Sequence, residues 1–168
     1  FYSPFPYAFS EIFHLIGFSY IDSLKIAFIT PFFLSAIGMY LLGNSFFGFG
    51  GGLISSVLYT FAPYHAIDAF VRGALAEHWA LSLLPLILFA LFKEKQHLFI
   101  LTLSILLLSH NLTALYFLPV LLLLALTQNK IKFVKKLIVY PILLTSFFIL
   151  PAIFEKNLTT VATMTQGY

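Results

Sequence analysis

Three ionisable side chains in one short stretch, Asp68, Arg72 and Glu77, carry the strongest chemical signal in this chain. The sequence on either side is apolar enough to lie in lipid, where ionisable groups are costly, so their presence predicts a functional site. Arg72 suits a phosphate or pyrophosphate, because its planar guanidinium offers paired donors and stays charged in any environment. Asp68 and Glu77 would then be the catalytic groups, acting as an acid or base or as ligands of a divalent cation.

The spacing of these residues predicts part of their geometry. Asp68 and Arg72 are four residues apart, so a helix would place them side by side as an ion pair. Glu77 lies about 140° around a helix from Arg72, so we expect it to point elsewhere unless the backbone bends at Gly73. The alternative to a functional site is an interfacial salt bridge that orients the loop.

Further polar residues are expected to complete the site. Tyr64 and His65 lie just before the charged residues and are candidates, with Arg72, for binding a substrate phosphate. Four more residues are expected to line the outer face of the site: Glu11, His14, His110 and Asn111. His110 and Asn111 could instead be a helix cap or a turn.

The histidines do not predict a metal centre. Glu11 and His14, like His65 and Asp68, are three residues apart and could share a ligand on a helix, but there is no HExxH motif. Whether a metal is bound, and which one, is therefore unknown from the sequence. A divalent cation held by carboxylates is the one cofactor that the charged residues suggest.

The composition excludes a soluble domain. Of the 168 residues, 61% are hydrophobic and 9% are charged, whereas soluble domains carry roughly 25% charged residues. We therefore predict an integral membrane protein whose partner is the lipid bilayer. Six of the nine basic residues lie in two clusters, Lys93–Lys95 and Lys130–Lys136, a pattern typical of membrane orientation rather than of nucleic-acid binding.

The apolar pattern predicts an all-α, polytopic transmembrane bundle with about six membrane-embedded helices. Residues 1–20 are expected to form an interfacial segment on the outer face, residues 21–154 the transmembrane helices, and residues 155–168 an outer tail. The first clear span is Asp22–Leu42, with Asp22 as its N-cap, and a tight turn is expected at Gly43–Gly52. We expect a single transmembrane domain that is a piece of a longer protein.

Loop charge predicts the orientation of the bundle. Residues 98–126 form either one long helix or a hairpin that turns at His110, and only the hairpin puts both lysine clusters on one side. The positive-inside rule favours the hairpin and makes both clusters cytoplasmic. Tyr64–Glu77 would then lie on the outer face of the cell membrane, with His110 and Asn111.

The stretch APYHAIDAFVRGALAEHWALSLLPLIL, with its Pro63-Tyr64 pair, Asp68, Val71-Arg72-Gly73 and Glu77, resembles a bacterial and archaeal family of multi-spanning proteins. That family is known as membrane protein, 6-pyruvoyl-tetrahydropterin synthase-related domain, and its architecture is similar to that of GT-C glycosyltransferases. The resemblance implies a polyprenyl-phosphate-linked sugar as donor at the outer face. It also implies that the main catalytic carboxylate lies upstream of this chain.

Three functions are compatible with these observations. The first is a GT-C-like glycosyltransferase of cell-envelope glycan assembly, in which Arg72 holds the lipid-linked phosphate. The second is a transporter or lipid flippase, for which proline-broken helices and intramembrane charges are typical. The third is a non-catalytic membrane scaffold, in which Asp68 and Arg72 form a structural pair.

Overall fold

The computed structural model describes residues 3–155, and these residues fold entirely into helices and their connections. The tail predicted for residues 155–168 lies, beyond its first residue, outside the described residues. The elements follow one another in this order: α1 (Phe5–Leu15), α2 (Tyr20–Thr60), α3 (Pro63–Ala66), the π-helix η1 (Ile67–Arg72), α4 (Leu75–Phe92), α5 (Gln96–Ser109), α6 (Asn111–Thr127), α7 (Ile131–Leu137) and α8 (Val139–Phe154). The prediction of an all-α protein is confirmed for the described part of the chain.

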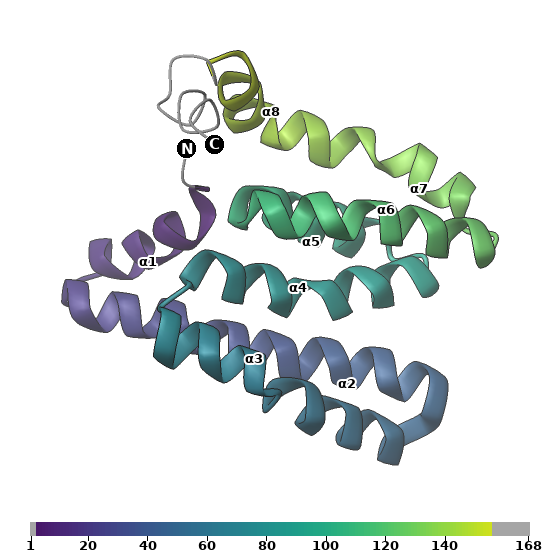
Figure 1. The fold of residues 1–168 in the computed structure, drawn as a ribbon, viewed down its shortest axis with the longest axis horizontal. Coiled ribbons are helices and arrows are strands. Elements are labelled where there is room, and N and C mark those ends of the chain that lie inside the picture. The colour runs from purple at the N-terminus through teal and green to yellow at the C-terminus, as the bar shows by residue number, and fades with distance from the viewer. Residues whose placement is uncertain (1–2, 156–168) are drawn as a thin grey trace, which may run out of the picture.

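Helix α2 consists of two limbs that fold back on one another at Gly48 (Figure 1). Gly48 has φ 70° and ψ −173°, a conformation that is essentially restricted to glycine. The predicted turn over Gly43–Gly52 is therefore wrong in its extent, because one glycine reverses the chain and the helix continues on both sides. The limbs are joined across the hairpin by Ser56 Oγ, which donates to the carbonyl oxygen of Ala36 at 2.8 Å.

A close approach at Gly52 lets the two limbs of α2 pack. A Cβ atom there would lie 2.9 Å from the Asn44 Cβ and 3.0 Å from the Tyr40 carbonyl oxygen. We expect Gly52→Ala to destabilise the protein by about 1–3 kcal/mol, because the backbone must move to admit a methyl group. Gly50→Ala is the matched control, since no atom lies within 4 Å of its Cβ position. Thermal unfolding in detergent would measure both, and equal melting temperatures would contradict the prediction.

The start of α2 differs in detail from the prediction. The N-cap is Ser19, whose Oγ accepts from the Asp22 N–H at 3.1 Å, and not Asp22 itself. Asp22 occupies the first turn instead, where the positive end of the helix dipole stabilises its carboxylate. It accepts from Ser19 Oγ at 2.8 Å and pairs with Lys25 at 3.0 Å.

Helix α4 is the centre of the bundle. It packs on α2 on one side and on α5 on the other, and α8 packs against the far side of α5 (Figure 1). Buried residues occur all around α4, from Leu75 to Leu91, as expected of a helix that is apolar on every face. The largest buried cluster continues from α4 into α5, α6 and α7 and includes Phe99 and Leu121, both 0% exposed.

The chain between the two lysine clusters forms a hairpin, as predicted, with α5 and α6 joined at His110. The loops after α4 and α6 meet at the same end of the bundle, where Lys130 forms an ion pair with Glu94. The α1–α2 connection, the α3–α4 segment and the α5–α6 junction gather at the opposite end (Figure 1). The hairpin thus separates the basic loops from the charged group around Arg72.

Two helical stretches are long and apolar enough to cross a membrane, Tyr20–Arg72 and Leu75–Phe92. A third span results if α7 and α8, which are bent by 43° relative to one another, are counted together. Helices α5 and α6 are apolar but shorter. The described residues therefore contain two or three candidate spans by length and composition, and the number of about six membrane-embedded helices stays a prediction.

Candidate functional site

The three predicted charged residues form one ion-pair group. Asp68 is 0% exposed, and its Oδ1 accepts from Arg72 Nη1 at 2.7 Å, as the four-residue spacing predicted. Glu77 also joins, with its Oε2 2.9 Å from the same Nη1. The bend at Gly73, named as the condition for this contact, is present: Gly73 has φ 59° and separates η1 from α4.

The segment that carries Asp68 and Arg72 is a π-helix, which a sequence pattern does not reveal. Such wide turns are rare and occur frequently at functional sites. Its end is fixed by the Ala74 N–H, which donates to the Asp68 carbonyl oxygen at 2.8 Å. The side-chain oxygen Asp68 Oδ2 is buried and has no hydrogen-bond partner among the described residues. The carboxylate therefore depends on Arg72 for its charge pairing.

Tyr64 closes the group on its exposed side. Its hydroxyl donates to Glu77 Oε1 at 2.6 Å and accepts from Arg72 Nη1 at 3.2 Å. Nη1 carries two hydrogens, which three acceptors now share. The contacts of the guanidinium with Asp68, Glu77 and Tyr64 all include Nη1, and the Arg72 side chain is 47% exposed, so part of it is accessible to a ligand.

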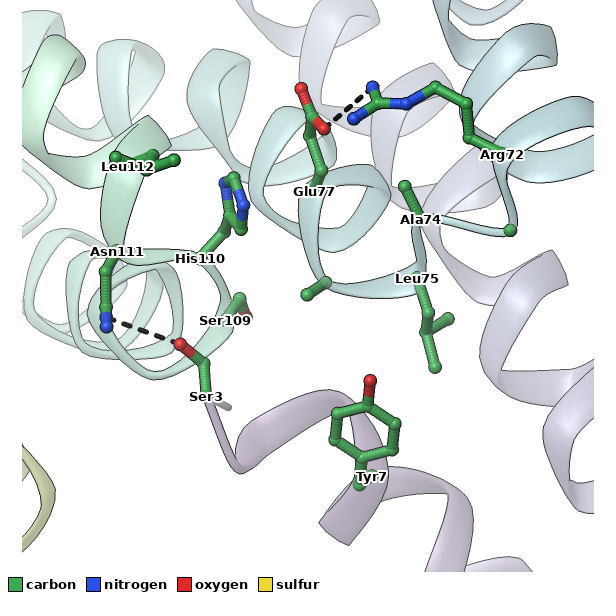
Figure 2. A pocket seen from close by; sticks show the side chains of 12 residues that line it. Ser3, Tyr7, Arg72, Ala74, Leu75, Glu77, Ser109, His110, Asn111 and Leu112 are labelled. Carbon is green, nitrogen blue, oxygen red and sulfur yellow. Dashed lines mark hydrogen bonds and ion pairs between the residues drawn. The ribbon is translucent and has the colours of Figure 1, made fainter. Parts of the chain in front are cut away.

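A pocket of about 400 Å³ lies beside this group (Figure 2). Three parts of the chain surround it: the start of α1, the η1–α4 connection and the α5–α6 junction. Its walls include the following residues: Ser3, Tyr7, Arg72, Gly73, Ala74, Leu75, Ala76, Glu77, Ser109, His110, Asn111 and Leu112. Figure 2 shows Tyr7 and His110 entering from opposite sides, with Glu77 and Arg72 along one edge.

His110 caps a helix, as one of its two predicted roles requires, and it also lines the pocket, while the outer position of the pocket stays a prediction. It is the N-cap of α6, where its Nδ1 accepts from the Thr113 N–H at 3.3 Å, and it lines the pocket. Asn111 follows it and accepts a hydrogen bond from Ser3 Oγ at 3.3 Å through Oδ1. This contact ties the first described residue of the chain to the α5–α6 junction.

The other predicted residues lie away from the pocket wall. His65 is 2% exposed and faces the fully buried His78, with 3.4 Å between the two Nδ1 atoms. Glu11 is exposed on α1. His14 forms a hydrogen bond within the α1–α2 connection, from its Nδ1 to the Phe18 carbonyl oxygen at 3.0 Å. Neither the His65–His78 pair nor Glu11 and His14 belong to the lining of the pocket.

Sequence reasoning missed Ser3 and Tyr7, which supply the α1 side of the pocket. Their four-residue spacing at a helix start is a usable signal, but the ionisable Glu11 and the polar His14 were the residues predicted from this segment. Helix α1 is held by Trp79, whose ring packs against Phe5 and Phe9 with centroid distances of 5.2 and 4.7 Å. Because these contacts join residues far apart in the chain, the sequence alone did not show which face of α1 points towards the pocket.

The charged residues do not form a metal centre by themselves. Among residues 3–155, no group of three or more histidine, aspartate or glutamate side chains is arranged to hold a metal ion. Asp68 and Glu77 both point to Arg72, which occupies the space between them. A cation at this pocket would need ligands from elsewhere, such as the oxygens of a bound phosphate.

The chain matches the family described as 6-pyruvoyl-tetrahydropterin synthase related domain; membrane protein, over residues 1–166. It therefore belongs to this family of membrane proteins, as the charged stretch suggested. No curated protein and no solved structure matches the chain.

Proposed function

Starting from membership of a membrane-protein family, we propose that this chain binds the phosphate of a polyprenyl-phosphate-linked sugar and takes part in its transfer, as a GT-C-like glycosyltransferase does. The pocket would face the outer side of the cell membrane, and the lysine loops the cytoplasm. The observation that carries the proposal is the half-exposed Arg72 guanidinium in the pocket wall, which Asp68, Glu77 and Tyr64 hold at Nη1.

Two helix starts add to the attraction for an anion. Helix α4 begins at Leu75 without a side-chain cap, so the N–H groups of its first turn are not engaged by a capping side chain. Helix α6 begins at Asn111, on the opposite wall of the same pocket. The positive ends of helix dipoles favour phosphate groups, and two such ends supplement the single guanidinium.

The residues divide into two roles under this proposal. Asp68 is buried and positions Arg72, whereas Glu77 lines the pocket and can accept a proton from an acceptor hydroxyl. In the transfer step the acceptor oxygen bonds to the anomeric carbon and the carbon–oxygen bond to phosphate breaks. The polyprenyl phosphate leaves with the negative charge, which Arg72 stabilises. The main catalytic carboxylate would be supplied from outside this chain.

The test is the binding of polyprenyl phosphate to the full-length protein in nanodiscs. We expect Arg72→Lys to weaken binding about tenfold, because an ammonium cannot reproduce the paired donors of the guanidinium. Lys25→Ala is the matched control: it removes an exposed positive charge on α2 that lies outside the pocket lining. Equal losses in both variants would mean non-specific attraction, and no loss in Arg72→Lys would refute phosphate binding here.

A scaffold role is the alternative, and the three acceptors gathered on Arg72 Nη1 favour it. In a scaffold, Arg72→Lys would lower the melting temperature while the folded fraction keeps whatever affinity it had. Measuring unfolding and binding on the same preparations therefore separates the two functions.

A further inference from the structure

A second cavity adjoins the polar pocket and differs from it in chemistry. It has a volume of about 570 Å³ and lies between α6 and α8. Apart from Asn111, every residue that lines it is apolar, including Leu115 and Leu118 of α6 and Phe148 and Ala152 of α8. Asn111 and Leu112 line both cavities, so the polar pocket and the apolar groove lie next to one another at the start of α6.

We propose that this groove holds the hydrocarbon chain of a single-chain lipid phosphate whose headgroup occupies the polar pocket. The inference rests on the proposed function and extends it by assigning the path of the polyprenyl chain. A ligand with a charged head and an apolar chain matches a polar pocket with an apolar groove directly beside it. Because a single groove adjoins the pocket at these two shared residues, we expect it to accommodate one chain.

The depth of the junction supports the same arrangement. Helices α5 and α6 have 14 and 17 residues, which correspond to roughly 21 and 26 Å of helix. The hydrocarbon core of a bilayer is about 30 Å thick. With the basic loops at one membrane surface, the α5–α6 junction lies a few ångströms below the opposite surface. A lipid can then enter sideways along α6 and α8, without its chain leaving the hydrocarbon.

Photo-crosslinking tests the path of the chain. The full-length protein in nanodiscs is irradiated with a polyprenyl phosphate that carries a diazirine near the phosphate end, and the labelled peptides are identified by mass spectrometry. We expect labelling of α6 around Leu115 and of α8 around Ala152. Ala152→Trp should fill the groove and reduce this labelling at least fivefold. Leu144→Trp is the control, because Leu144 is an exposed residue of the same helix outside the groove.

Two further measurements separate this inference from the proposed function. A short-chain prenyl phosphate should bind equally to the wild type and Ala152→Trp, but more weakly to Arg72→Lys. If labelling of Ala152→Trp equals that of the wild type, the groove assignment is wrong while phosphate binding stands. If the short-chain phosphate binds Arg72→Lys as tightly as it binds the wild type, the assignment of the phosphate site is wrong. Equal competition by phosphatidic acid would overturn the preference for a single chain.

Discussion

Trp79→Ala is expected to destabilise the protein by about 3–5 kcal/mol and to open the candidate site. Trp79 is 2% exposed, and its ring lies between α4 and α1, in contact with Phe5 and Phe9. Its Nε1 donates to the Ala27 carbonyl oxygen of α2 at 2.9 Å. One side chain thus joins three helices, and its removal leaves a cavity where α1 is attached.

The functional consequence follows from the position of α1. Ser3 and Tyr7 form one side of the pocket, and they are held there by the contacts of the same helix with Trp79. We expect Trp79→Phe to retain part of the ring packing and to lose the hydrogen bond and some buried volume, at a smaller cost of about 1–2 kcal/mol. Thermal unfolding and polyprenyl phosphate binding, measured on both variants, check the prediction. Unchanged binding in a folded Trp79→Ala protein would show that α1 does not shape the site.

The local part of the site was predictable from the sequence. Asp68 and Arg72 are neighbours on one helix, and their spacing alone was enough to predict the ion pair. Glu77 was not, because its direction depends on a bend whose presence a glycine permits but does not require. In the structure Gly73 takes a positive φ and turns α4 back towards η1. The contact of Glu77 with Arg72 is a consequence of that single residue.

The pocket, in contrast, needed the tertiary structure. Its walls come from three segments far apart in the chain, and no local pattern states which of their faces meet. His65 illustrates the problem, because its place beside the charged residues suggested the pocket, whereas η1 and α3 turn it inward to His78. The position of both basic loops at one end of the bundle was easier to predict, because lysine clusters tend to lie on the same side of a membrane. The ion pair between Lys130 and Glu94 shows that both clusters share one end.

The α2 hairpin shows a similar division between pattern and geometry. The glycine-rich stretch predicted that the chain reverses, which it does, but the reversal needs only Gly48. Of the other glycines, Gly43 and Gly52 serve the packing of the limbs, Gly43 against Ser55 and Gly52 against Asn44. Composition therefore predicted that a turn exists. The length of the turn depended on which glycine adopts a backbone conformation that other residues cannot.

Single cysteines are expected to react from opposite sides of the membrane according to the end of the bundle on which they lie. The 168-residue chain contains no cysteine, so introduced thiols are the ones that report from it. Ala66 and Asn111 are exposed at the end that holds the pocket, and Lys95 and Gln128 are exposed at the end of the basic loops. In intact cells a membrane-impermeant maleimide should label cysteines at the first two positions and leave the other two unlabelled.

The expectation follows from charge, because both lysine clusters lie at one end and such clusters favour the cytoplasmic side. Labelling of all four variants after permeabilisation is the control for folding and thiol exposure. If Ala66→Cys reacts only after permeabilisation, the pocket faces the cytoplasm. A polyprenyl-linked sugar used at the outer face could not then reach Arg72, and the glycosyltransferase proposal would fail. Because the pocket and the basic loops occupy opposite ends, this one pattern decides the orientation of the whole bundle.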